Sequence, residues 1–192
     1  TQANKVVAGD HLDSQITAKD KHVVILGGGD TGADCLGTAT RQGAASVTTI
    51  AIGIKPPEQR DENHPWPTTP NLFEIASAHE EFGNREYLHS TVEFVGENGT
   101  LTGIKVADTE FVDGKRLPKA GTERIMKADL VLLALGFTGN ESDEISAQLG
   151  AVLDRSTNIA RDNDYRVKDS IFVAGDAGRG QSLLVWAIAE GR

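Results

Sequence analysis

The fold is decided by one stretch, residues 22–32, which reads HVVILGGGDTG. Its first half, residues 22–26, is a continuous apolar run, as expected for a strand buried on both faces of a parallel sheet. Its second half, residues 27–32, matches G-x-G-x-x-G. After a strand and before a helix, such a turn can hold a pyrophosphate, because its glycines permit a tight bend, close approach of the backbone to the anion, and close helix packing. The stretch therefore predicts a dinucleotide site, with a simple strand-ending turn as the plainer alternative.

The residues that follow complete a βαβ unit. Small and apolar residues recur at helical spacing from Asp30 to Gln42, and Gly43 closes this helix in a usual C-terminal position. A second strand is predicted over Ser46–Ile52. The helix start offers unpaired N–H groups to an anion. Asp30 and Thr31 are expected to cap the helix and to touch phosphate or ribose, with a plain capping role as the alternative.

The end of the second strand leaves the choice between NADH and NADPH open. NAD-selective folds often place an acid there, and NADP-selective folds an arginine. Residues 51–55 read AIGIK and offer neither. Lys55 could reach a 2′-phosphate, although an exposed lysine without a ligand is the plainer interpretation.

The middle of the chain changes character twice. Residues 55–70 carry five of the six prolines, and Trp66 stands between two of them, which predicts a stiff irregular loop. A helix is expected over Leu72–Phe82. From Thr91 to Ile125 the sequence shows runs with the alternation of a strand, separated by glycine-containing turns. This pattern predicts an antiparallel β-meander. Residues 129–135 are then predicted to form another fully buried strand.

A second cofactor signature lies near the end of the chain. Ile171–Ala174 is predicted as a buried strand that ends at Gly175 and Asp176, and a helix is expected over Ser182–Glu190. A carboxylate at such a strand end can accept hydrogen bonds from the ribityl hydroxyls of a flavin. A helix start can direct N–H groups at the electron-rich edge of the ring. Gly-Asp after a strand is weak evidence alone, but stronger together with the upstream turn.

Composition excludes several classes of protein. The net charge of −9 and the absence of a basic cluster argue against a nucleic-acid partner. The chain has a single cysteine, Cys35, which excludes an internal disulfide and a cysteine-bound iron–sulfur cluster in this chain. We interpret Cys35 as a residue that packs in the core. A single free thiol also fits a reducing cytoplasm. No histidines have metal-ligand spacing, and no metal site is expected. No apolar run approaches the roughly 20 residues of a membrane helix. Both ends suggest a piece of a longer protein.

Five segments together resemble the small subunits of glutamate synthases and the related two-dinucleotide flavoprotein reductases. The segments are GGGDTGADC (27–35), NHPWP (63–67), ALGF (134–137), AGDAGRGQSL (174–183) and WAIAEGR (186–192). The resemblance covers nearly the whole chain, and residues 175–192 are its most specific part. One departure is the lack of the Arg-Arg pair that many NADPH-dependent bacterial members carry after the second strand, so the chain looks more like the branch that includes NADH-type plant enzymes.

The strand pattern and this resemblance predict an α/β fold. We expect a Rossmann-like three-layer ββα sandwich with an antiparallel β-meander, plus part of an FAD-binding domain. The resemblance implies a linker over residues 1–20, an NAD(P)-binding domain over residues 21–140 and a return to the FAD-binding domain over residues 141–192.

The resemblance also implies an oxidoreductase that passes electrons from NAD(P)H through FAD and iron–sulfur clusters to a large subunit. That subunit makes glutamate from 2-oxoglutarate and glutamine. The clusters belong to the full-length protein only, FAD needs a half-domain that lies outside this chain, and the isolated chain is expected to be inactive. A homo-oligomer is possible, and no side chain need act as acid or base, because hydride transfer is cofactor chemistry.

The expected binding residues fall into two groups. Those for NAD(P) are Gly27, Gly28, Gly29, Asp30, Thr31, Gly32, Lys55 and Gly136. Those for FAD are Gly175, Asp176, Gln181, Ser182 and Leu183. Two alternatives stay open: a related module that feeds ferredoxin or another acceptor, and a nucleotide-binding module without catalysis.

Overall fold

The computed structural model of the protein describes residues 2–11, 14–60, 62, 65 and 72–192, without the side chains of Ser142, Asp143 and Ser146. The chain divides into two compact units, Thr1–Leu135 and Gly136–Arg192, which are described separately. Trp66 and most of the 63–67 segment lie outside the described residues, so the predictions made for them stay predictions.

The centre of the first unit is a parallel sheet. In the described part of the chain, four strands follow the order β3-β2-β1-β8. They are β1 (His22–Leu26), β2 (Ser46–Ala51), β3 (Asn84–Tyr87) and β8 (Leu130–Leu133). Val24 of β1 pairs with Thr48 of β2 on one side and with Val131 of β8 on the other. The predicted βαβ unit is confirmed, and its crossover helix is α2 (Asp30–Arg41).

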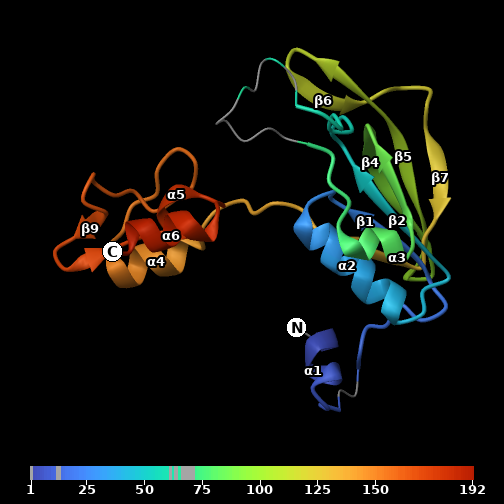
Figure 1. Cartoon of the computed structure of the whole chain (residues 1–192), viewed down its shortest axis with the longest axis horizontal. Coiled ribbons are helices and arrows are strands. Elements are labelled where there is room, and N and C mark those ends of the chain that lie inside the picture. Colours follow the sequence, from blue (N-terminus) through green and yellow to red (C-terminus); the bar gives the residue numbers. More distant parts are fainter. Residues whose placement is uncertain (1, 12–13, 61, 63–64, 66–71) are drawn as a thin grey trace. The chain divides into compact units, whose positions relative to one another are not determined.

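Helices cover one face of this sheet. Helix α2 and the short α3 (Ser77–Glu81) lie on the same side of it (Figure 1). The buried residues of this face come from the strands, from α2 and from the segment before β1: Ala18, Val23, Ile25, Leu36, Ala39 and Val47. A further short helix, α1 (Gln2–Val7), has no buried residues.

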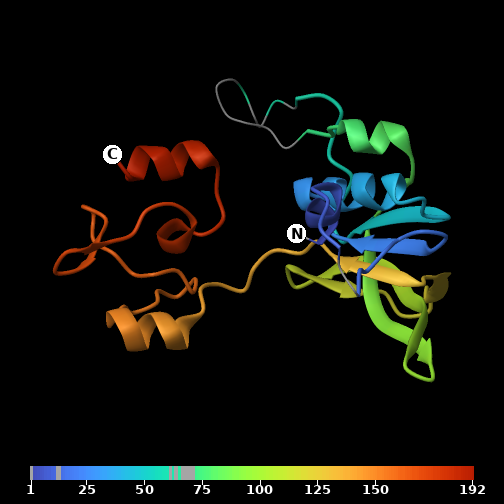
Figure 2. The same cartoon turned by 90° about the horizontal axis from the view of Figure 1, so that it is seen from below.

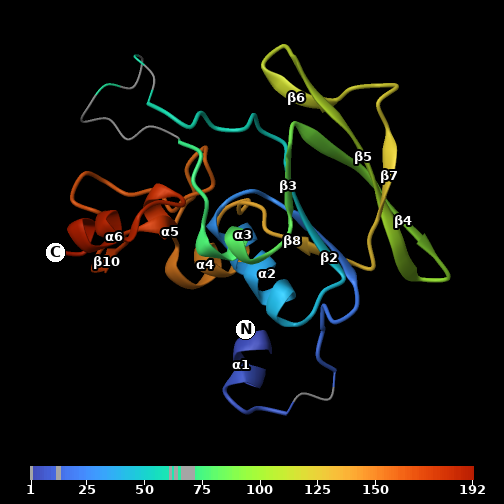
Figure 3. The ribbon, with the colours of Figure 1, turned by 45° about the vertical axis from the view of Figure 1, so that its right-hand side comes forward.

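An antiparallel sheet covers the opposite face. Its strands are β4 (His89–Glu97), β5 (Thr100–Val112), β6 (Lys115–Pro118) and β7 (Arg124–Lys127). The long strand β5 pairs with each of the other three (Figure 3). The buried residues between the two sheets are Val24, Leu26, Ile50, Ile104, Val106 and Ala128. Figure 2 shows the resulting order of helices, parallel sheet and meander. The predicted α/β three-layer sandwich with its meander is therefore confirmed.

The second unit is smaller and has little sheet. Its elements are α4 (Ser142–Leu149), β9 (Arg166–Lys168), β10 (Ile171–Phe172), α5 (Asp176–Arg179) and α6 (Leu184–Glu190). Strands β9 and β10 form an antiparallel pair. Ala151, Ile159 and Glu190 are buried. Within the described residues of the chain, no helix is both long and apolar enough to cross a bilayer.

The helix predicted over Leu72–Phe82 is wrong in its first half, because α3 begins only at Ser77. Phe73 instead contacts other segments of the chain. Its N–H donates to the Pro57 carbonyl at 2.8 Å, and the cationic groups of Lys55 and Arg85 contact its ring. Ile75, one of the apolar positions of the predicted helix, is exposed. Strand β3, which begins just after Gly83, was missed because its sequence NREY is polar and lacks the apolar pattern of a buried strand.

Two strands predicted as fully buried are only partly so. Strand β8 covers residues 130–133, and Leu133 and Leu135 are 65% and 61% exposed. This strand is an edge of the parallel sheet, with β1 on one side of it. Near the C-terminus, β10 has two residues, and β9 is its one partner strand in the described part of the chain. Phe172 of β10 is 57% exposed. An apolar run reports the tendency to be buried, not whether a covering element is present.

Candidate functional site

The glycine turn joins β1 to α2, and its first glycine is required by the fold itself. The Gly27 N–H donates to the Ile50 carbonyl at 2.9 Å, which continues the pairing of β1 with β2. Its φ of +121° lies where residues with a side chain are strained. A Cβ at Gly27 would lie 2.1 Å from the Ala134 carbonyl oxygen, so no side chain fits.

The third glycine of the pattern is also required by packing. A Cβ at Gly32, on the first turn of α2, would lie 2.3 Å from the Gly27 carbonyl oxygen. Gly28, between the pattern positions, is less crowded, since of the described atoms its Cβ would meet the Ala51 Cβ alone, at 3.1 Å. Gly27 and Gly32 together let the helix start lie directly against the end of the strand.

The second glycine of the pattern, Gly29, is different. A Cβ there would meet no described atom within 4 Å, and φ is −89°, which any residue adopts. Gly29 is the N-cap of α2, with the extended backbone that Ser, Thr, Asp and Asn favour at this position. Neither crowding nor backbone geometry within the described protein explains a glycine here. The position leaves open space beside the backbone at the start of a helix.

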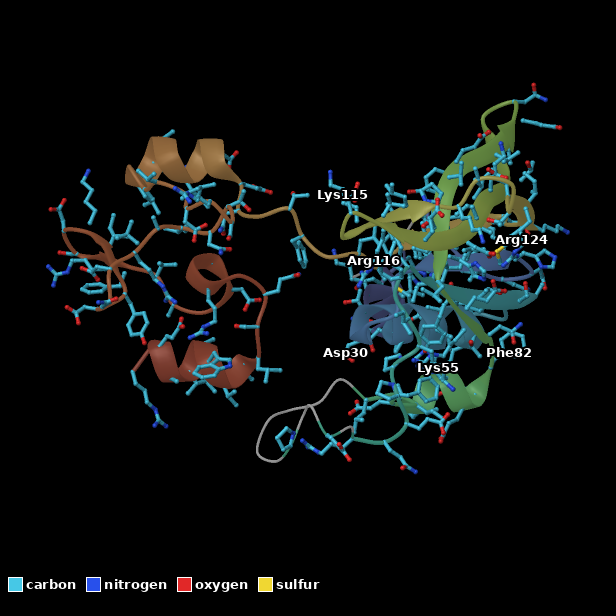
Figure 4. All side chains as sticks on the ribbon, turned by 90° about the horizontal axis from the view of Figure 1, so that it is seen from above. Asp30, Lys55, Phe82, Lys115, Arg116 and Arg124 are labelled. Carbon is cyan, nitrogen blue, oxygen red and sulfur yellow. The ribbon has the colours of Figure 1, made fainter. Side chains whose placement is uncertain are left out.

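Among the residues that the structure describes, no side chain caps the start of α2. The first intrahelical bond runs from the Ala33 N–H to the Gly29 carbonyl at 3.1 Å, so the N–H groups of the preceding turn have no partner along the helix. The expectation that Asp30 and Thr31 cap this helix is wrong, because both lie inside it and the N-cap position is Gly29. Asp30 is exposed at the first helical position (Figure 4). The helix start thus offers N–H groups and partial positive charge to an anion.

Lys55 follows β2 and is already engaged by protein groups. Its Nζ lies 3.0 Å from Glu58 Oε1 and 4.2 Å from the centre of the Phe73 ring. Figure 4 shows Lys55 on the helix side of the first unit, with Lys115 and Arg116 on the meander side. Arg85 of β3 contacts the same ring at 4.7 Å. The sequence did not suggest this cation–aromatic cluster, because its members come from three separate segments.

The predicted flavin-side residues form a turn in the second unit. Gly175 is buried and is the N-cap of α5, with φ +69°. A Cβ at Gly175 would lie 2.9 Å from the Ala187 Cβ of α6, so glycine is needed both for backbone conformation and for packing. Asp176 is exposed, and its Oδ1 accepts the Ser182 N–H at 3.2 Å.

Asp176 borders a cavity of about 530 Å³ within this unit, and Asn140, Asn158 and Gln181 also line it. Gln181 and Ser182 are exposed, and Leu183 is 69% exposed. Gly136, expected with the nucleotide residues, is the first residue of the second unit, and a Cβ there would lie 3.4 Å from Gln181 Oε1.

Glu190 is the feature of this region that sequence analysis missed. Its side chain is 1% exposed and bonds to Arg161, to Arg179 and to the Gly175 N–H. The available signal was a single acid at the end of the apolar segment LLVWAIAE, where the charge needs partners if it is buried.

Cys35 packs against the helix-face core, as interpreted from the sequence. Burial is the main reason that the pKa of its thiol is raised, and the charge of Asp34 adds to the shift. The described residues contain no group of three or more histidines, cysteines and acids placed to hold a metal ion.

The residues present fit the two cofactors that this kind of fold holds. The space beside Gly29, where any Cβ would project, and the uncapped start of α2 fit a diphosphate. The exposed carboxylate of Asp176, on a cavity with amide side chains, fits a polyhydroxyl chain. A three-layer unit with a glycine turn between β1 and α2 defines the class of dinucleotide-binding α/β domains.

Comparison with known proteins agrees with this class. The family model of pyridine nucleotide-disulphide oxidoreductases matches residues 6–191. The chain belongs to this family of oxidoreductases.

Several similar proteins are glutamate synthases. The glutamate synthase [NADPH] small chain of Mycobacterium tuberculosis (strain H37Rv) is 47% identical over 99% of this chain and 40% of that protein. The glutamate synthase [NADH] of Schizosaccharomyces pombe is 40% identical over 92% of this chain and 9% of that protein. The resemblance to glutamate synthase small subunits is confirmed. The chain spans about 40% of the length of the small chain that it matches.

A solved structure supports the fold alone. Thioredoxin reductase from T. acidophilum aligns with a TM-score of 0.62 and 22% identity, over 90% of this chain and 50% of that one.

Proposed function

We propose that this chain is the nucleotide-binding part of a glutamate synthase small subunit, which takes electrons from NAD(P)H and passes them through FAD. The observation that carries the proposal is Gly29, a glycine at an N-cap where the described structure leaves room for a side chain. A serine would cap the helix better. Because glycine stands here although a capping side chain would stabilise the helix, the position fits a backbone that a ligand must approach closely.

When bound, the nicotinamide and the flavin supply the hydride and electron transfer. The chain's own residues bind and orient. N–H groups of residues 28–32 hold the diphosphate against the start of α2, and Gly29 provides the close approach. Asp176 accepts hydrogen bonds from the ribityl hydroxyls, and its carboxylate is held by the Ser182 N–H. None of these side chains needs to move a proton.

The wider function rests on the named relatives. In this proposal the full-length protein supplies the rest of the FAD-binding domain and the iron–sulfur clusters. A large subunit accepts the electrons and makes glutamate. The cytoplasm is the compartment that we propose for this assembly. The confirmed resemblance to glutamate synthase small chains supports these assignments.

The test is a pair of opposite effects at one residue. Gly29→Ser should raise stability by a few tenths of a kcal/mol, because serine caps a helix better than glycine. The same change should weaken nucleotide binding at least about tenfold, a loss of about 1.4 kcal/mol, because its side chain occupies the space of the diphosphate. Gly29→Val should abolish binding. Calorimetric titration of the full-length protein with NADH and with NADPH, together with thermal unfolding, measures both effects.

Unchanged nucleotide affinity in Gly29→Ser and Gly29→Val would contradict the site. Tight binding without flavin reduction in the wild-type protein would instead favour a nucleotide-binding module without catalysis.

A further inference from the structure

The second unit contains a buried ion cluster directly behind the predicted flavin-side turn. At its centre is Glu190, at the end of α6, with a side chain that is 1% exposed. Arg161 binds both carboxylate oxygens, at 2.8 Å to Oε2 and 2.9 Å to Oε1. The Nε of Arg179 donates to Oε1 at 2.6 Å. The fourth bond comes from the backbone, since the Gly175 N–H donates to Oε2 at 2.8 Å.

The two arginines are themselves fixed. Arg161 also donates to the Val173 carbonyl at 2.9 Å and lies 4.7 Å from the centre of the Tyr165 ring. The guanidinium of Arg179 lies 4.5 Å from the centre of the Trp186 ring. Trp186 and Glu190 both belong to α6. The planar guanidinium groups therefore hold the carboxylate in one orientation.

Glu190 is ionised at neutral pH. The hydrogen bonds from Arg161 are the main reason that its pKa is lowered to about 2. Burial acts in the opposite direction, and the bonds from Gly175 and Arg179 add to the lowering. Two arginines and one carboxylate leave a surplus positive charge in the cluster.

Helix α6 holds the turn at two points. Glu190 binds the Gly175 N–H, and the Ala187 Cβ lies so close that a Cβ at Gly175 would be 2.9 Å away. Asp176 is the next residue and begins α5. The backbone conformation of Gly175 sets the direction in which Asp176 leaves the turn, so the position of its carboxylate depends on these contacts.

We infer that Glu190 is a positioning residue for the flavin: it fixes the Gly175 N–H and thereby places the Asp176 carboxylate against the ribityl chain, while the arginines that it binds set the charge behind the turn. This inference rests on the proposed function, because it requires FAD at Asp176. It adds a residue that does not itself touch the cofactor.

The test uses three variants of the full-length protein that differ in cluster charge. Glu190→Gln keeps the size of the side chain but removes its charge and one acceptor oxygen. Arg179→Gln removes one positive charge from an arginine whose side chain is 35% exposed, so this variant should fold even if the first does not. The double variant Glu190→Gln/Arg179→Gln restores the net charge of the wild-type cluster.

Two measurements separate positioning from charge. The dissociation constant of FAD should rise at least tenfold in both variants that lack the carboxylate, because one amide oxygen cannot accept the four bonds that two carboxylate oxygens accept from Gly175 and the arginines. The midpoint potential of the bound flavin should follow the charge, because nearby positive charge stabilises added electrons. It should be highest in Glu190→Gln, lowest in Arg179→Gln, and close to wild type in the double variant.

A purely structural role predicts another pattern. The thermal stability of the second unit would then fall in the variants while the flavin potential stayed constant, and this outcome would overturn the inference. Normal FAD affinity in Glu190→Gln would do the same. A wild-type full-length protein without FAD would instead refute the proposed function, so the two failures are distinguishable.

Discussion

At the scale of single residues, the turn shows that one sequence pattern contains glycines with different roles. Gly27 and Gly32 have backbone oxygens of the same unit within 2.3 Å of where a Cβ would stand. A Cβ at Gly29 would meet no atom of the described residues within 4 Å. Two of the three glycines therefore build the turn, and the third leaves room beside it. Stability and ligand binding should respond separately to changes at these positions.

Gly32→Ala should destabilise the first unit by roughly 1–3 kcal/mol, because the added methyl group meets backbone that cannot move aside easily. Gly37→Ala is the matched control. It lies on the same helix and gains the same helix propensity, but the three atoms nearest to its Cβ would belong to side chains, at 3.1–3.4 Å. Denaturant unfolding of both variants measures the difference. Equal stabilities would show that the close approach of Gly32 to Gly27 is not a packing constraint.

The sequence could predict the turn and the separate role of each glycine in it, but not which atoms crowd Gly27 and Gly32. The pattern G-x-G-x-x-G gave the location of the bend, since strand and helix signals flank it. Whether a Cβ would meet Ala134, which follows 107 residues after Gly27, depends on tertiary contacts that no local pattern records. Glu190 was missed for the same reason, because its partners Arg161 and Gly175 are distant in sequence.

At the scale of elements, strand β5 connects the meander to the parallel sheet. Ile104 and Val106 of β5 are fully buried in the core between the two sheets. The alternating pattern of residues 101–109 predicted this strand, because alternation is the signature of a sheet with one buried face. The polar edge strand β3 carries no such signal. It is part of the sheet through its parallel pairing with β2, which its own sequence does not indicate.

Ile104→Ala should cost roughly 2–5 kcal/mol, the range for a large aliphatic side chain removed from a packed core. Ile125→Ala on the neighbouring strand β7 is the control, since Ile125 is 58% exposed and should change stability by only about 0.5 kcal/mol. Urea unfolding followed by circular dichroism compares the two. A small effect at Ile104 would mean that the meander does not depend on the core between the sheets.

At the scale of the whole molecule, the two units are built in different ways. The first has two apolar cores on either side of a parallel sheet. In the described residues of the second, Ala151 and Ile159 are the buried apolar side chains, and they accompany the ionised Glu190 cluster. Exposed apolar side chains on α6, among them Leu184 and Val185, add little to that core. The second unit should therefore be the more sensitive to pH.

The sign of this sensitivity follows from the pKa of Glu190, which is lowered from its ordinary 4.5 to about 2 in the folded chain. A lowered pKa means that the folded state favours the charged form, so its stabilising effect is complete above about pH 4.5 and is lost as the pH falls towards 2. Hydrogen exchange of the segment 171–190 should show protection that is constant from pH 7 to 5 and decreases below that window, after correction for the intrinsic exchange rate. The Glu190→Gln variant should be less protected at pH 7 and should lack the part of the pH dependence that Glu190 contributes. Parallel pH profiles for the two proteins would show that the carboxylate does not titrate as the buried, arginine-bound group that the structure describes.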